Sequence, residues 1–161
     1  MSRTVVLSIL LLAALGCWAS SVATEFTNGT AQVERTLPDG RVVKATVTSR
    51  AYTQGTLYEA PLWWGAETAP PRSVVSNVQV EVGDHVYFIP LSAFADLANP
   101  TDVTISFDDS VQIVIRGGEA STAYEAVLYF GDNTISKRRV FHREFPEDTW
   151  EATEYSFKLY D

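Results

Sequence analysis

The stretch SVVSNVQVEV, residues 73–82, alternates apolar and polar side chains with a period of two. The valines at positions 78, 80 and 82 fall on one side of an extended chain, and Asn77, Gln79 and Glu81 fall on the other. A strand with one apolar and one polar face buries only the apolar face, which is typical of an antiparallel sheet packed on one side. The stretch therefore predicts a strand of a layered all-β fold.

The same alternation recurs on both sides of this stretch, interrupted by short turn sequences. We expect three hairpins, with strands at 31–37 and 41–49 around PDG, at 102–107 and 111–116 around DDS, and at 122–130 and 134–143 around GDN, followed by a last strand at 150–160. This spacing predicts an antiparallel β-sandwich in a single domain, residues 24–161, with a small β-barrel as the alternative.

Other segments depart from the alternation. HVYFIPL (85–91) is apolar on both faces, which predicts a central strand. SAFADLANP (92–100) predicts one helical turn or a corner, and GGEAS (117–121) predicts a corner or bulge. The proline-rich segment 50–72 predicts a long connection with a short strand near 56–59.

The first 23 residues have the features of a secretory signal peptide. Arg3 supplies a positive start, and an apolar run follows from Val5 to Leu15, shorter than the ~20 residues that a membrane-spanning helix needs. Ser21, Val22 and Ala23 place small residues where a signal peptidase cuts. We therefore expect export to the periplasm or extracellular space, with cleavage after Ala23 and no transmembrane helix in the mature chain.

A competing cut site precedes Cys17, the only cysteine. The tetrapeptide Ala14-Leu15-Gly16-Cys17 resembles the lipobox of bacterial lipoproteins, although that pattern has Leu where Ala14 stands and a smaller residue where Leu15 stands. The resemblance implies lipidation of Cys17 and anchorage to a membrane. Release and anchorage are the two alternatives.

Charge and composition exclude several classes of partner. The formal net charge is −8, and the predicted signal peptide carries one base and no acid. Such a chain repels the phosphates of nucleic acids and anionic lipid headgroups. A chain cut after Ala23 has no cysteine, so its stability comes from burial and not from disulfides.

The sequence offers few side chains for catalysis. The two histidines, His85 and His142, lie far apart, and no serine stands in a nucleophile-elbow pattern. Their spacing, without a mature cysteine, does not predict a zinc site, and no cofactor is expected. The late acids from Glu144 to Glu154 could serve a carboxylate-dependent hydrolase. The basic residues at 137–139 favour another interpretation, in which acids and bases neutralise each other across a solvated sheet face.

The best candidate for a binding site is the aromatic cluster in the long connection. Trp63 and Trp64 stand next to each other, with Tyr52 and Tyr58 nearby. Neighbouring residues of an extended chain point in opposite directions, so one tryptophan can be buried while the other contacts a ligand. The alternative is that both tryptophans cover the open end of the sandwich.

These features predict an exported β-sandwich without catalytic activity that binds or scaffolds in the cell envelope or outside the cell. Its partner would be a protein or a glycan, and not a nucleic acid. Two alternatives remain, a carbohydrate-binding module that uses Trp63 and Trp64, and a carboxylate-dependent hydrolase.

Overall fold

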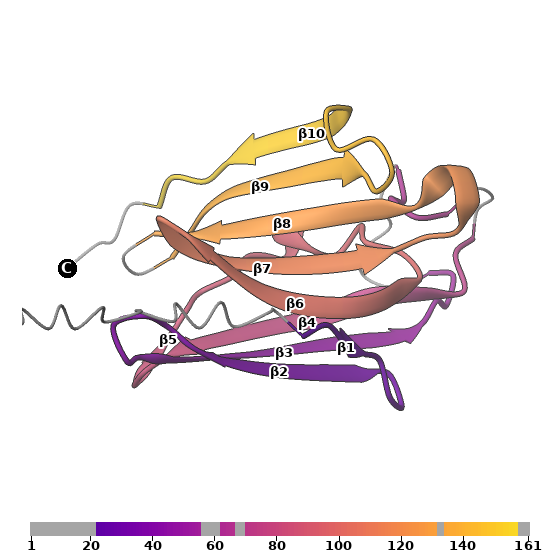
Figure 1. Ribbon diagram of the computed structural model, residues 1–161. Helices are drawn as coiled ribbons and strands as arrows, with labels where there is room; N and C mark the ends of the chain where they lie inside the picture. Colours follow the sequence, from indigo (N-terminus) through magenta and orange to yellow (C-terminus); the bar gives the residue numbers. More distant parts are fainter. Residues whose placement is uncertain (1–21, 56–61, 67–69, 132–133, 158–161) are drawn as a thin grey trace, which may run out of the picture.

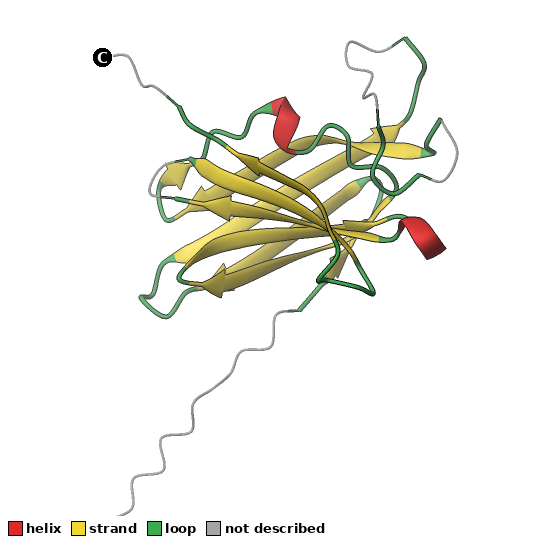
Figure 2. Cartoon of the chain, turned by 90° about the horizontal axis from the view of Figure 1, so that it is seen from above, coloured by secondary structure: helices red, strands yellow, loops and turns green. Residues whose placement is uncertain are grey.

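The computed structural model describes residues 22–55, 62–66, 70–131 and 134–157. Ten strands account for most of this part of the chain. They are β1 Thr24–Glu25, β2 Thr30–Thr36, β3 Val42–Ala51, β4 Ser73–Val82, β5 His85–Val86, β6 Pro100–Asp108, β7 Ser110–Gly117, β8 Tyr124–Phe130, β9 Ile135–His142 and β10 Thr149–Glu154. Two single 3-10 turns, η1 (Leu91–Ala93) and η2 (Ala120–Thr122), lie in the connections at the periphery of the strands (Figure 2).

The strands form two antiparallel sheets. One has six strands in the order β1-β6-β7-β8-β9-β10, and the other has four in the order β2-β3-β4-β5. The two sheets lie one above the other in a sandwich-like arrangement (Figure 1). All-β structure with two antiparallel sheets is therefore confirmed, and the described strands do not join into one closed sheet.

The alternation in the sequence sets which residues enter the space between the sheets. Val78, Val80 and Val82 of β4 are buried, while Asn77 and Gln79 are exposed. The three predicted hairpins are present as β2–β3, β6–β7 and β8–β9. The core includes valines of β3 and β4 from one sheet and isoleucines and leucines of β6, β7 and β8 from the other, among them Val43, Val47, Val80, Ile105, Ile113, Ile115 and Leu128.

Two strand predictions differ from the structure. The predicted last strand, 150–160, ends at Glu154, and residues 155–157 are not in a strand. HVYFIPL was expected to form a central strand, but its strand β5 has only two residues, His85 and Val86, at the edge of the four-stranded sheet. Val86 and Phe88 are more than half exposed, and Tyr87 is buried. Pro90 cannot donate a backbone hydrogen bond, and the chain leaves the sheet before it to form η1. Apolar residues on both faces therefore do not place a strand at the centre.

Two other expectations agree with the structure. The 3-10 turn η1 begins at Leu91 and includes the first two residues of SAFADLANP, and GGEAS forms a corner in which Gly118 has a φ of +77°. The lead-in before residue 30 contains β1, which the sequence pattern did not predict and which pairs with β6. The predicted signal peptide and the predicted strand at 56–59 lie outside the described residues, apart from Val22 and Ala23. No helix in the described ranges has the length and apolar character to cross a membrane.

Candidate functional site

The two tryptophans predicted as a binding site are both half-buried, in the short described segment 62–66. Trp63 meets Tyr52 edge to face, with ring centroids 5.5 Å apart. Trp64 packs against different neighbours, as expected for adjacent residues of an extended chain. The other two predicted residues, Tyr58 and Cys17, lie outside the described residues.

The backbone of Trp64 is fixed to the segment that precedes β6. Its N–H donates to the Asp96 carbonyl at 3.0 Å, and its own carbonyl accepts the N–H of Ala98 at 2.8 Å. Asn99 adds a second clamp, because its side chain donates to the Gly65 carbonyl and accepts the backbone N–H groups of Arg72 and Ser73. The segment that carries the tryptophans is therefore fixed by hydrogen bonds at Trp64 and at Gly65.

A groove of about 310 Å³ opens beside these residues. We call it the aromatic groove, and it is lined by Leu62, Trp63, Trp64, Gly65, Ala66, Ser121, Thr122 and Trp150. The lining comes from the long connection, from η2 and from the start of β10, which all lie at the end of the sandwich where β6 begins and β7 ends. The sequence pattern does not predict Trp150 as part of the site, because the residue stands 86 positions after Trp64 and only the sheet order brings the two together.

Trp64 and Trp150 form a stacked pair. Their ring centroids are 5.4 Å apart and their planes differ by 18°. Each indole N–H donates to a carboxylate, that of Trp64 to Glu151 Oε2 at 3.0 Å and that of Trp150 to Asp148 Oδ2 at 3.3 Å. Both rings are therefore oriented by hydrogen bonds as well as by packing.

The Glu151 carboxylate, which accepts the indole N–H of Trp64, belongs to a buried ionic network centred on Arg138. The Arg138 side chain is 1% exposed, and its guanidinium lies 2.8 Å from Asp96 and 3.4 Å from Glu151. It also donates to the Ser92 carbonyl at 2.8 Å. Thr153 donates to the other oxygen of Glu151 at 2.7 Å. The network thus connects β9, β10, the segment after η1 and the indole of Trp64.

The prediction that the basic residues at 137–139 lie on a solvated sheet face is wrong for Arg138. The strands pair as expected, with Glu154 opposite Lys137 and Thr153 opposite Arg138. However, Arg138 also stands opposite Leu128, a core residue, so it points between the sheets and not into solvent. A period of two assigns alternate residues to opposite faces but does not say which face is buried when both carry charges.

Burial shifts the pKa values of this network. Desolvation raises the pKa of Asp96, and the hydrogen bond and charge of Arg138 offset this only in part. For Arg138, burial acts to lower the pKa, but the hydrogen bond that it donates to Asp96 and the charges of Asp96 and Glu151 outweigh this effect and raise the pKa. The guanidinium therefore stays charged and compensates two carboxylates.

The groove lies against a buried tyrosine. Tyr124 is 0% exposed, its hydroxyl has no hydrogen-bond partner among the described residues, and burial raises its pKa. Gly65 and Gly117 both press on this side chain, since a Cβ on Gly65 would lie 2.5 Å from Tyr124 Cε1 and one on Gly117 would lie 2.6 Å from the hydroxyl. Only glycine allows the backbone this close approach.

The remaining chemical candidates do not converge. His85 lies at β5 beside Tyr87, whereas His142 ends β9 and contacts Trp150 and Phe145. The chain turns from β4 into β5 at the end of the sandwich opposite the groove, so the histidines are at opposite ends. Within the described ranges, no group of three or more His, Cys, Asp or Glu side chains is arranged to hold a metal ion.

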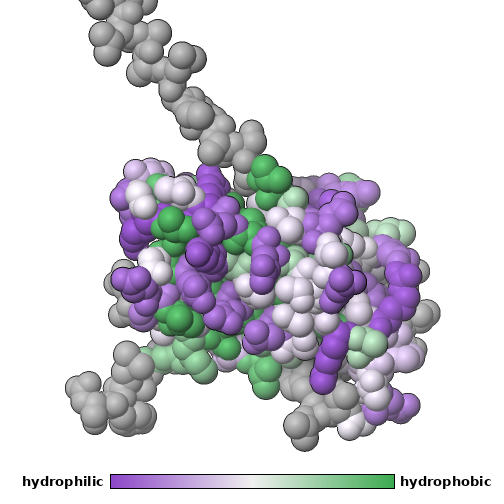
Figure 3. Space-filling model, turned by 90° about the horizontal axis from the view of Figure 1, so that it is seen from below, coloured by the Kyte–Doolittle hydropathy of each residue, from purple (hydrophilic) through white to green (hydrophobic). Residues whose placement is uncertain are grey.

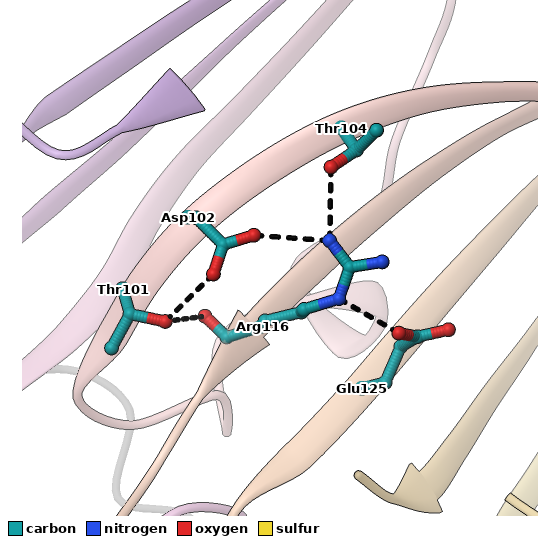
Figure 4. A network of polar contacts seen from close by, with 5 residues as sticks. All are labelled: Thr101, Asp102, Thr104, Arg116 and Glu125. Carbon is teal, nitrogen blue, oxygen red and sulfur yellow. Dashed lines mark hydrogen bonds and ion pairs between the residues drawn. The ribbon is translucent and has the colours of Figure 1, made fainter. Parts of the chain in front are cut away.

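A second ionic cluster lies on the outer face of the six-stranded sheet (Figure 4). Arg116 binds Asp102 at 3.0 Å and Glu125 at 2.8 Å, and it donates to the Thr104 hydroxyl at 2.9 Å. Asp102 and Glu125 are its direct neighbours on β6 and β8. The cluster satisfies its own charges across three strands, so we interpret it as structural.

The outer face of the four-stranded sheet carries a larger and more polar hollow. It measures about 420 Å³ and includes Gln32, Glu34, Lys44, Thr46, Gln79 and Glu81 in its lining. Seen from this side, the surface is mostly hydrophilic, with separate hydrophobic areas (Figure 3). Lys44 and Glu34 lie 3.6 Å apart, and Gln79 donates to Glu81 at 2.8 Å. A polar, solvated sheet face explains this hollow, so the aromatic groove is the stronger candidate site.

Comparison with protein-family models, with curated proteins and with solved structures found no match to this chain.

Proposed function

We propose that this protein is an exported binding module without catalytic activity, which acts in the cell envelope or outside the cell through the aromatic groove. The single observation that carries the proposal is the groove itself, where three tryptophans from two distant parts of the chain line one hollow. Such a hollow buries ligand surface on rigid aromatic faces. The hydrogen bonds that fix Trp64 and Trp150 reduce the entropy lost on binding.

The contacts of the acidic residues favour a binding function over a hydrolase. A carboxylate-dependent hydrolase needs two carboxyl groups that face a substrate, one as acid and one as base or nucleophile. Asp96 and Glu151 do approach each other, but both bind Arg138, and Glu151 also accepts hydrogen bonds from Trp64 and Thr153. Neither lines the groove. Their arrangement is that of a supporting network for Trp64.

Export is tested by the intact mass of the protein recovered from cells that express the full chain. We expect a chain that starts at Thr24, and an acyl group on Cys17 would establish the anchored alternative. Recovery of the unprocessed chain, starting at Met1, would contradict export by this route.

Binding through the groove is tested by sedimentation of the protein with a cell-envelope fraction from its source. We expect the wild-type protein to sediment with this fraction and Trp63→Ala to lose most of the effect. Phe88→Ala is the matched control, because Phe88 is a 60% exposed aromatic residue that does not line the groove. Equal sedimentation of the wild type and both variants would contradict a role for the groove.

A further inference from the structure

The aromatic groove offers little capacity for hydrogen bonding from its side chains. None of the lining residues is charged, and only Ser121 and Thr122 carry hydroxyl groups. The Thr122 hydroxyl donates to the Glu119 carbonyl at 2.8 Å and accepts the Glu119 N–H at 3.4 Å. The indole N–H groups of Trp64 and Trp150 are occupied by carboxylates. A sugar, which must exchange many hydrogen bonds with water for bonds to protein, finds few partners here.

The same rings are well suited to a positive charge. An indole face attracts cations more strongly than the other aromatic side chains do, and the attraction grows when the cation is desolvated. A carboxylate that accepts the indole N–H places negative charge in the plane of the ring and increases this attraction. Asp148, which forms no ion pair within the described ranges, does so for Trp150. Glu151 accepts the indole N–H of Trp64, but Arg138 partly neutralises its charge.

The charges at the edge of the groove have the complementary sign. The loop from β9 to β10, which leads directly into Trp150, contains Glu144, Glu147 and Asp148 against one base, Arg143. All three acids are exposed, and none of them forms an ion pair with a residue in the described part of the chain. The chain as a whole has a formal net charge of −8, which includes these acids. The negative electrostatic potential raises the local concentration of cations at the groove.

We propose that the aromatic groove binds a quaternary ammonium group, as in choline, by cation–π contacts with Trp63 and with one outer face of the stacked Trp64–Trp150 pair, and that the acidic loop before Trp150 attracts it. A quaternary ammonium group donates no conventional hydrogen bond, so the small polar capacity of the lining does not penalise it. The inference rests on the proposed function, because it names the ligand class of the same groove.

The test uses tryptophan fluorescence. The chain has four tryptophans, and three of them line the groove. In the full chain with Trp18→Phe, all tryptophan emission therefore comes from the groove. This protein is titrated with choline chloride, with sodium chloride at equal ionic strength, and with 3,3-dimethylbutan-1-ol, the uncharged carbon analogue of choline. We expect a saturable change with choline and a response at least tenfold weaker with the alcohol.

Two variants test the residues. Trp63→Ala should weaken choline binding by roughly 5- to 30-fold, as expected for the loss of a desolvated cation–π contact. Glu144→Gln with Glu147→Gln should weaken it by roughly 2- to 5-fold at low salt and reduce its salt dependence. Asp84→Asn with Asp108→Asn removes the same charge at the opposite end of the sandwich and should leave binding unchanged. If Trp63→Ala does not fold, the two double variants still decide the question.

The outcomes separate this inference from the proposed function. Equal responses to choline and to the alcohol, or no response to either, would overturn the cation inference. If Trp63→Ala nevertheless lost sedimentation with the envelope fraction, the binding function would stand and a different ligand class, such as a glycan, would replace the cation. Phosphatidylcholine vesicles identify the source, since vesicle binding that depends on Trp63 would assign the group to a lipid headgroup and its absence, with choline bound, to a free compound.

Discussion

The indole N–H of Trp64 donates a 3.0 Å hydrogen bond to the carboxylate of Glu151, 87 positions later in the chain. Glu151 in turn contacts the buried guanidinium of Arg138. A binding surface and a core ionic network are thus joined through one carboxylate. Four predictions test how the network and its surroundings support the groove.

Removing the carboxylate of Glu151 should loosen Trp64. Glu151→Ala leaves the half-buried indole N–H without its acceptor and Arg138 with one partner fewer, and should cost about 1–3 kcal/mol of stability. Glu151→Gln retains an oxygen acceptor and should cost less. Urea unfolding and the wavelength of tryptophan emission measure both effects.

Glu154 provides the matched control for this prediction. It is an exposed acid on the same strand, opposite Lys137. Glu154→Ala should change stability by less than about 0.5 kcal/mol. If Glu154→Ala were as destabilising as Glu151→Ala, the hydrogen bond to Trp64 would have no special role.

Removing the charge of Arg138 should destabilise the protein strongly. Arg138→Met preserves much of the side-chain volume but leaves Asp96 and Glu151 facing each other without a counter-ion, which should cost about 3–5 kcal/mol in urea unfolding. Arg50→Met, at the exposed end of β3, should stay within about 0.5 kcal/mol of the wild type. Similar stability of the two variants would show that the network does not depend on its cation.

The raised pKa of Asp96 predicts a pH dependence of defined sign. In the folded chain, burial lets Asp96 hold its proton at pH values where the unfolded chain, with a value near 3.8, has lost it. Its contribution to stability is therefore fully present below 3.8 and is lost as the pH rises through the folded pKa.

Asp96→Asn removes this titration. Relative to the variant, the wild type should lose melting temperature as the pH rises above about 4, and the difference should become constant at neutral pH. Melting curves of both proteins at a series of pH values measure this difference. A wild type that instead gains on the variant with rising pH would mean that Arg138 dominates and that the pKa is lowered.

The close contact between Gly65 and Tyr124 can be tested by comparing alanine substitutions at Gly65 and at Gly40. Gly65 and Gly40 have similar positive φ values, +91° and +87°, so alanine at either position carries a similar backbone strain of about 1–2 kcal/mol. A Cβ at Gly40 meets nothing within 4 Å, whereas one at Gly65 lies 2.5 Å from the Tyr124 ring and 2.6 Å from the Ala98 carbonyl.

We therefore expect Gly65→Ala to destabilise the protein by about 1–3 kcal/mol more than Gly40→Ala, because it adds overpacking to the strain. Thermal or urea unfolding of the two variants measures the difference. Equal losses would indicate that the backbone at Gly65 moves away from Tyr124 without cost.

The alternation of side chains was sufficient to predict most of the strands, because a strand with one apolar face has only one way to bury it. Residues 73–82 form β4 as expected, and all three hairpins are present. The pattern gave no information where it was uniform, so the apolar residues 85–91 were placed at the centre of a sheet although β5 lies at an edge. It also missed β1, whose two residues are too few to show a period.

Part of the site could be predicted from the local composition of the sequence. Trp63 and Trp64 stood out because aromatic residues are concentrated in a proline-rich connection. Trp150, Asp96 and Arg138 did not, because nothing in their local sequence distinguishes a residue that faces the core from one that faces solvent. The order of strands in the six-stranded sheet decides that β10 brings Trp150 and Glu151 to Trp64.

The sequence by itself determined the class of the fold, the hairpins and the acidic character of the protein, since these follow from local periodicity, turn residues and charge. Only the tertiary structure decided which charges are buried and which tryptophans share a groove. The buried charges and the shared groove depend on contacts between segments far apart in the chain. A period of two does not determine which strands become neighbours.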